Sequence, residues 1–266
     1  MSQLLLRNHE PDATGLVHRV TPESAGWERV GFATYRLKPG QVVEQATGEN
    51  EVCLVLIGGK ATITAGGDRY EAIGERANPF EGKPWSVYVP WHERWRVEAL
   101  TDLELAVCEA PGGGDYRTRL IHPDQVKFTT RGKAANTRHV YDILPETEPA
   151  NALLVVEVIT PSGCWSSYPS HKHDTDDFPN ETALEEIYYH RLNPPQGFAF
   201  QRVYTDDRSL DETMCLHDAD VVMVPRGYHP VGTPHGYDLY YLNVMAGPKR
   251  VWKVNTEQCH RWLLQA

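Results

Sequence analysis

The 266-residue sequence lacks a long apolar run and lacks an excess of positive charge. No stretch approaches the roughly 18 consecutive apolar residues of a membrane-spanning helix, and the start, MSQLLLRNHEPD, does not resemble a secretory signal. Lys and Arg number 26 against 36 Asp and Glu, a formal net charge of −10, which opposes binding to nucleic acid or an anionic membrane. We therefore expect a cytoplasmic protein that binds neither.

Closely spaced cysteine pairs are also missing. Five cysteines are spread along the chain without a Cys-x-x-Cys pair, namely Cys53, Cys108, Cys164, Cys215 and Cys259. This pattern argues against a zinc ribbon or a dithiol redox centre and favours reduced, mostly buried thiols.

Helical periodicity is scarce, and 19 prolines and 21 glycines separate short runs rich in β-branched and aromatic residues. Such runs are typical of an all-β sandwich or barrel. The clearest predicted strands are Glu51–Ile57, Ala61–Thr64, Trp85–Val89 and Asp220–Val224. The best candidates for helices are short, namely Thr182–Glu186 and Thr256–Leu264.

An internal repeat relates the two halves of the chain. Glu51 begins a strand 39 residues before Pro90, and Glu186 begins a similar strand 39 residues before Pro225, so both pairs match at one offset of 135 residues. The repeat predicts two tandem β domains, residues 1–125 and 126–266.

The second half contains a set of residues suited to metal binding. His171 and His173 are two positions apart, so on a strand both imidazoles point to one face. Glu186 begins a later strand, and His229 follows Pro225 by four residues. Three imidazoles and one carboxylate suit a divalent transition metal and leave one or two positions open. Zn is the first choice, with Mn, Fe, Ni and Co as alternatives.

The carboxylate ligand has competitors in the sequence. Glu185 adjoins Glu186, and Asp176 and Asp177 lie in the preceding acidic stretch. The repeat aligns Glu186 with Glu51, and its strand continues as Ile187-Tyr188-Tyr189, so both observations favour Glu186.

The third imidazole also has a competitor, and the first half lacks equivalents. His235 follows a proline, as His229 does, but His229 lies closer to the proline and glycine that precede it. In the first half, no histidine occurs in 36–50, and Arg94 takes the place of His229 at the repeat offset. We expect no metal there, and a structural or surface role for His92.

The ordered set His-x-His, Glu, Pro-x-Gly-x-His resembles the two motifs of the cupin superfamily, although residues 174–185 are inserted between the histidine pair and the glutamate. With the segments 131–138, 189–204 and 224–247, nearly the whole chain is similar to the bacterial 5-deoxy-glucuronate isomerases of myo-inositol degradation. These enzymes are relatives of the 4-deoxy-5-threo-hexosulose-uronate isomerases of pectin breakdown.

The resemblance implies an all-β bicupin fold that assembles into a homo-oligomer and binds a small sugar acid. It implies one divalent ion per chain and conversion of 5-deoxy-D-glucuronate to 5-dehydro-2-deoxy-D-gluconate. The alternatives are 4-deoxy-5-threo-hexosulose-uronate or another uronate as substrate. Two other classes are an iron dioxygenase on the same barrel and a non-catalytic sugar-acid binding protein.

An aldose–ketose isomerisation also needs a group that moves hydrogen between two carbons. Tyr241 and Glu212 are our candidates, with Tyr188 and His190 open as alternatives, because the facing of each depends on strand register.

The substrate carboxylate calls for a guanidinium group, which can bind both of its oxygens. Arg202 is the first candidate because it lies on a largely apolar strand, and Arg138 and Arg226 follow. A structural ion pair is the competing interpretation of Arg202.

Overall fold

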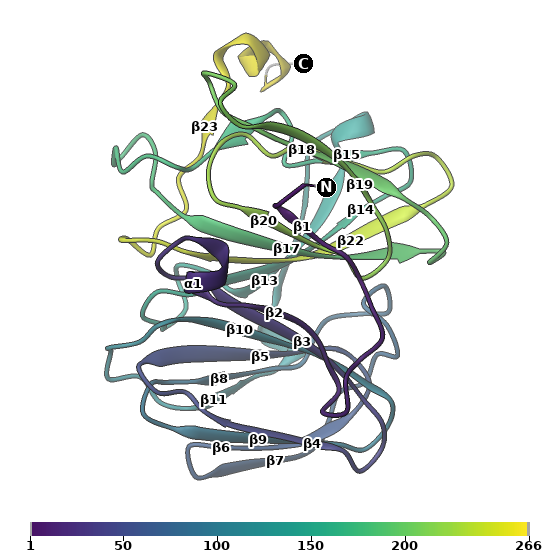
Figure 1. Ribbon diagram of the computed structural model, residues 1–266, viewed down its shortest axis with the longest axis vertical. Coiled ribbons are helices and arrows are strands. Elements are labelled where there is room, and N and C mark those ends of the chain that lie inside the picture. The colour runs from purple at the N-terminus through teal and green to yellow at the C-terminus, as the bar shows by residue number, and fades with distance from the viewer. Residues whose placement is uncertain (1, 265–266) are drawn as a thin grey trace. The chain divides into compact units, whose positions relative to one another are not determined.

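The computed structural model describes residues 2–264, and the chain divides into two compact units. Unit 2 consists of His9–Lys127 and Asp142–Val155, and unit 1 consists of Phe128–Tyr141 with the described residues of Met1–Asn8 and Val156–Ala266. Each unit is built almost entirely from antiparallel strands in layered sheets (Figure 1). The predicted all-β bicupin fold is confirmed.

Unit 2 contains a six-stranded sheet, β11-β8-β5-β10-β3-β2, and a four-stranded sheet, β4-β9-β6-β7. Its elements are β2 (Leu16–Val20), α1 (Pro22–Ala25), β3 (Gly31–Leu37), β4 (Val42–Ala46), β5 (Asn50–Gly58), β6 (Ala61–Ala65), β7 (Asp68–Ile73), β8 (Ser86–Val89), β9 (Arg94–Ala99), β10 (Leu103–Pro111), β11 (Arg119–Ile121) and the 3-10 helix η1 (Pro123–Gln125).

The core of unit 2 follows from the two-residue period of its strands. Val52, Leu54 and Leu56 of β5 point to one face and pack in a cluster with residues of both sheets, among them Trp95. These side chains are at most 1% exposed, so a Leu-to-Ala change there should lower the free energy of unfolding by about 2–5 kcal/mol.

Unit 1 contains a seven-stranded sheet, β1-β20-β17-β22-β14-β13-β12, a four-stranded sheet, β15-β21-β18-β19, and the pair β16-β23. The elements of these sheets and their connections are β1 (Leu5–Leu6), β12 (Lys127–Arg131), the 3-10 helix η2 (Ala134–Asn136), β13 (Arg138–Leu144), β14 (Leu154–Thr160), β15 (Trp165–Ser166), β16 (His171–Lys172), β17 (Glu185–Asn193), β18 (Ala199–Tyr204), β19 (Asp211–Leu216), β20 (Val221–Val224), β21 (Val231–Gly232), β22 (Asp238–Ala246), β23 (Asn255–Thr256) and the 3-10 helix η3 (Gln258–Leu264).

The interior face of β17 carries Glu186, the predicted carboxylate ligand. Tyr188 and Leu192 belong to the apolar core of unit 1. Because side chains alternate along a strand, Glu186 and His190 share that face. All four side chains are at most 2% exposed.

One of the two expected helices needs correction. Thr182–Glu186 is not helical, because Thr182 is held by hydrogen bonds to the backbone carbonyls of Val251 and Lys253, and Glu185 already begins β17. Tertiary pairing thus overrides the local preference. The C-terminal segment does form a helix, as the 3-10 helix η3.

The compact units also differ from the continuous domain ranges 1–125 and 126–266. The segment Asp142–Val155 belongs to unit 2, and the described part of Met1–Asn8 belongs to unit 1, where β1 pairs with β20. A short strand far from the rest of its unit in sequence carries no pattern that assigns it.

The predicted alignment of Glu186 with Glu51 is wrong by one residue. Glu186 pairs with Val224, the residue before Pro225, whereas the residue before Pro90 pairs with Val52. Val52 therefore occupies the place of Glu186, and Glu51 faces away from the core of unit 2, as Glu185 faces away from that of unit 1.

Within residues 2–264, no helix is long and apolar enough to cross a membrane.

Candidate metal centre

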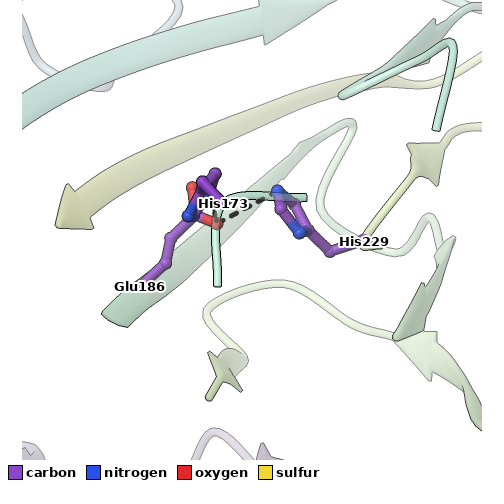
Figure 2. Close-up of side chains that lie close together, drawn as sticks. All are labelled: His173, Glu186 and His229. Atoms are coloured by element: carbon purple, nitrogen blue, oxygen red, sulfur yellow. Dashed lines mark ion pairs between the residues drawn. The ribbon is translucent and has the colours of Figure 1, made fainter. Parts of the chain in front are cut away.

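Three elements of unit 1 bring the predicted ligands together. His171 lies in β16 and His173 directly follows it, while Glu186 is the second residue of β17. His229 lies between β20 and β21. Figure 2 shows the side chains of His173, Glu186 and His229 converging.

The centre of the cluster is the Glu186 carboxylate. Its Oε2 lies 3.1 Å from Nε2 of His173 and 3.1 Å from Nε2 of His229. These three residues are at most 2% exposed, and their ligand atoms lie within 4.8 Å of one another. Oε2 and both Nε2 atoms have no hydrogen-bond partner within residues 2–264. These three buried atoms without a hydrogen-bond partner fit a bound cation, because buried polar atoms nearly always have a partner.

His171 lies beside this cluster rather than inside it. Its ring centroid is 5.3 Å from that of His229, at an interplanar angle of 86°. Among the four predicted ligands, it is the one that also lines the neighbouring cavity.

The outer nitrogens of all three histidines face backbone carbonyls. Nδ1 of His171 lies 3.2 Å from the Pro169 oxygen, Nδ1 of His173 lies 3.2 Å from the Leu184 oxygen, and Nδ1 of His229 lies 2.8 Å from the Gly227 oxygen. A carbonyl only accepts, so each Nδ1 carries the proton. In the neutral ring, Nε2 then presents its lone pair, which is the form that binds a metal.

The protonation states agree with this arrangement for most of the set. Burial, followed by the neighbouring histidines, lowers the pKa of His171 to about 3, and burial also lowers the pKa of His229. For His173, burial acts in the same direction, but the Glu186 carboxylate outweighs it and raises the pKa. Burial opposes ionisation of Glu186, yet His229 and His173 lower its pKa to about 2. The carboxylate is therefore ionised at neutral pH.

Polar contacts behind the predicted ligands hold them in place. The side-chain amide of Asn243 on β22 donates a hydrogen bond to Oε1 of Glu186. Lys172, between the two histidines, points away from the cluster and binds the carboxylates of Asp174 and Glu181 at 2.5 and 3.1 Å. Glu181 also accepts the backbone N–H groups of Asp174 and Thr175.

A cavity of about 270 Å³ adjoins His171. It is small for a ligand site, since such pockets usually measure about 300–1,000 Å³, and it suits a small molecule. Its walls come from β12, β13, β14, β17, β22, the segment 167–171 and the C-terminal segment, and they include Tyr188, Tyr241, Asn243, Arg138 and Trp252.

Both tyrosines in this wall are hydrogen-bonded to consecutive serines. Tyr241 Oη lies 2.6 Å from Ser166 Oγ, and Tyr188 Oη lies 2.8 Å from Ser167 Oγ. Neighbours on a regular strand point to opposite faces. Ser167 has a positive φ of 49°, which breaks that alternation and lets both hydroxyls reach the tyrosines.

The other candidates for hydrogen transfer lie elsewhere. Glu212 does not line the cavity. It lies on the same face of β19 as Met214 and Leu216, which belong to the apolar core. His190 stacks on the Tyr188 ring at a centroid distance of 5.8 Å, behind the cavity wall. Burial lowers the pKa of His190 to about 4, so its ring is neutral at neutral pH.

Arg202 is not at the cavity, so our first choice for the substrate carboxylate needs correction. Its guanidinium binds Asp211 through Nε at 2.8 Å and Nη2 at 2.7 Å, and it lies over the Tyr204 ring. Arg202 shares the exposed face of β18 with Phe200, opposite the buried Gln201. Strand alternation alone therefore directs it away from the cavity.

The remaining competitors are also outside the cluster. Asp176 is exposed and pairs with Lys249, and Asp177 and His235 are exposed. Arg226 is exposed as well, and Glu185 points to the opposite face of β17 from Glu186.

A second group of possible ligand atoms lies near η3. It consists of Glu257, Cys259 and His260. The Glu257 carboxylate already accepts the Tyr204 hydroxyl at 2.5 Å and pairs with Arg208 at 3.2 Å, which disfavours a cation there.

Sequence reasoning missed Asn243, Asp174 and Trp252 as parts of this site. Asn243 lies two residues after Tyr241 on β22, so the same strand period that placed the tyrosine could have found it. Asp174 and Trp252 lie in irregular segments, whose contacts no sequence period predicts.

Comparisons with known proteins agree with this architecture. A model described as the KduI/IolB family matches residues 4–263. The 5-deoxy-glucuronate isomerase of Geobacillus kaustophilus (strain HTA426) is 55% identical over 267 residues, covering 100% of this chain and 97% of the relative. The protein of that name from Bacillus subtilis (strain 168) is 47% identical over 270 residues and covers 100% of both chains.

Solved structures extend the comparison. The crystal structure of an IolB-like protein from Salmonella typhimurium LT2 has a TM-score of 0.96 at 52% identity, covering 98% of this chain and 99% of that one. Oxalate decarboxylase of Lactobacillus farciminis has a TM-score of 0.69 at 15% identity, covering 100% and 91%, which is a likeness of fold alone. Matched along nearly its whole length, the chain belongs to the KduI/IolB family.

Proposed function

We propose that this isomerase converts 5-deoxy-D-glucuronate to 5-dehydro-2-deoxy-D-gluconate and needs one divalent metal ion per chain. The supporting observation is the set of buried Nε2 atoms of His173 and His229 around the Glu186 carboxylate, with His171 next to a cavity of about 270 Å³. The full-length relatives named 5-deoxy-glucuronate isomerase support the choice of substrate.

His171, His173, Glu186 and His229 would hold the ion, with Zn as our first choice. When bound, a divalent ion polarises the substrate carbonyl and stabilises the negative charge that develops on oxygen. The backbone carbonyls behind each Nδ1 keep the imidazoles in the ligating tautomer. Asn243 holds Glu186 from the other side.

Tyr241 is the chain's own group for proton movement. Burial raises the pKa of its hydroxyl, despite the opposing hydrogen bonds from Ser166 and Ser167, so Oη is protonated at neutral pH. It can donate a hydrogen bond to a substrate oxygen and exchange that proton with Ser166. Val140 and Val158 add apolar surface to the same cavity wall.

The test is to incubate purified protein with 5-deoxy-D-glucuronate and follow the ketose by NMR, with the metal content measured in parallel. We expect turnover without oxygen consumption, loss of turnover after chelation, and recovery on adding a divalent salt. Turnover that survives complete metal removal would contradict the metal requirement. Oxygen uptake would point to a dioxygenase instead. Preference for 4-deoxy-5-threo-hexosulose-uronate would transfer the proposal to that substrate.

A further inference from the structure

The charge of the cavity beside His171 is opposite to that of the whole chain. Its lining includes two cationic side chains, Arg131 and Arg138, and no Asp or Glu among the residues that the structure places there. The protein as a whole carries a formal charge of −10. A positively charged cavity in an acidic protein is a feature that attracts an anionic ligand.

Arg138 is the more enclosed of the two cations. It is half-buried at the start of β13, and its Nη1 donates hydrogen bonds to the backbone oxygens of Asn136 at 3.1 Å and Tyr168 at 3.2 Å. Those two acceptors fix the direction of the side chain. Within residues 2–264, no carboxylate pairs with it, and Tyr241, Arg131 and Tyr188 line the same cavity.

Arg131 lies further out. It is exposed, and its guanidinium lies over the Trp252 ring, 5.9 Å from the centroid. This position suits a supporting charge at the rim rather than a direct clamp.

We propose that Arg138 binds the substrate carboxylate, with its free guanidinium N–H groups directed at the carboxylate oxygens, so that the opposite, carbonyl end of the sugar acid lies toward His171. This inference rests on the proposed function for the identity of the substrate. A partly buried guanidinium held by two carbonyls, without an acidic partner, has unused donors in the planar arrangement that a carboxylate fits.

The arrangement also assigns a specificity. A neutral sugar of the same length would leave the half-buried Arg138 charge without a counter-ion in the cavity, which is unfavourable. Arg138 therefore selects uronates over the corresponding neutral aldoses. Arg131 adds a second, weaker attraction at the rim.

The test compares Arg138→Ala with Arg202→Ala in the metal-loaded full-length protein. Arg202 is the matched control, because it is an arginine of the same unit, paired with Asp211 on an exposed sheet face. Each variant is assayed with 5-deoxy-D-glucuronate and with 5-deoxy-D-glucose, which has a hydroxymethyl group in place of the carboxylate. Metal content and thermal unfolding confirm that each variant is folded and loaded.

We expect Arg138→Ala to raise KM for the acid by about 10- to 100-fold, as for a lost hydrogen bond to a charged group, and to change kcat less. The preference for the acid over the neutral sugar should fall by a similar factor, and added guanidinium should restore part of the activity. Arg202→Ala should leave KM and the preference unchanged. An unchanged KM and preference in a folded, metal-loaded Arg138→Ala protein would overturn the proposal.

Failure of the proposed function is distinguishable from failure of this assignment. If the wild type does not turn over 5-deoxy-D-glucuronate, the binding of that acid is measured by calorimetry in the wild type and both variants. An affinity that falls tenfold or more only in Arg138→Ala would still assign the carboxylate site. Equal affinities, or no binding to the wild type, would reject it.

Discussion

The Asp174 carboxylate accepts a hydrogen bond of 2.8 Å from the backbone N–H of Gly227. Asp174 follows His173, and Gly227 precedes His229 by two residues, so this bond joins the two segments that carry these imidazoles. The other carboxylate oxygen pairs with Lys172, which lies between His171 and His173. One side chain thus sets the spacing between β16 and the loop after β20.

Replacing Asp174 with Ala should weaken metal binding without removing a ligand. Loss of a partner behind the ligands typically lowers metal affinity by about 10- to 100-fold. The affinity is measured by competition with a chromogenic chelator. Asp176→Ala is the control, because Asp176 is exposed and pairs with Lys249 at the surface. Equal affinities in the two variants would mean that Asp174 has no part in positioning the ligands.

Metal removal should lower the thermal stability of the whole-length protein. A cation that binds only the folded state stabilises it by about 2.7 kcal/mol when present at 100 times its Kd. We expect about one equivalent per chain and a lower unfolding temperature after chelation, reversed by a divalent salt. His173→Ala should abolish this shift, while His92→Ala, at an exposed position in unit 2, should keep it. Two equivalents per chain would contradict the expectation that only the second half binds metal.

The strand periods made much of this fold and centre predictable. Spacing of two between His171 and His173 and the proline before His229 identified residues that the structure brings near Glu186. The choice of Glu186 over Glu185, however, used an alignment with Glu51 that is one residue out of register. A repeat indicates equivalent strands, but a shift of one residue reverses the face, and only the pairing partners reveal it.

The choice of Arg202 over Arg138 for the substrate carboxylate also depended on a sheet face that the sequence does not reveal. Arg202 lies on a largely apolar stretch, whereas Arg138 lies between Thr137 and His139. The pairing of β18 with β19 sets Arg202 against Asp211 in space, while the start of β13 brings Arg138 to the cavity. Such contacts between segments distant in sequence have no local signal.

In unit 2, Glu51 is a structural carboxylate, and its loss should destabilise the protein. It is fully buried; Oε2 accepts from Tyr88 Oη at 2.5 Å and Asn151 N at 2.7 Å, and Oε1 accepts from Ala152 N at 2.6 Å and Leu153 N at 2.7 Å. In Glu51→Gln, an NH₂ group replaces one of these oxygens and leaves at least one buried N–H group unsatisfied.

This change should cost at least about 2 kcal/mol of unfolding free energy, as for a lost charged hydrogen bond. Urea unfolding followed by fluorescence measures it. Glu49→Gln is the control, since that side chain is 80% exposed. Metal content should stay at the wild-type level in both variants. A Glu51→Gln protein as stable as Glu49→Gln would show that the bonds to 151–153 contribute little.

Removing the Tyr241 hydroxyl should slow the reaction while leaving the metal bound. Tyr241 lines the cavity and bonds to Ser166, so Tyr241→Phe keeps the ring packing in the core but removes the proton that we assign to the substrate oxygen. Loss of a proton-transfer group typically lowers kcat by about 10²- to 10⁴-fold. Ser166→Ala should lower kcat by a smaller factor if Ser166 exchanges that proton. Tyr237→Phe, next to Phe198 and outside the cavity lining, is the control and should leave kcat unchanged. Steady-state kinetics with measured metal content separates the outcomes. A Tyr241→Phe enzyme with full metal and wild-type kcat would show that another residue of the cavity moves the proton. Tyr188→Phe would then be the next variant to assay.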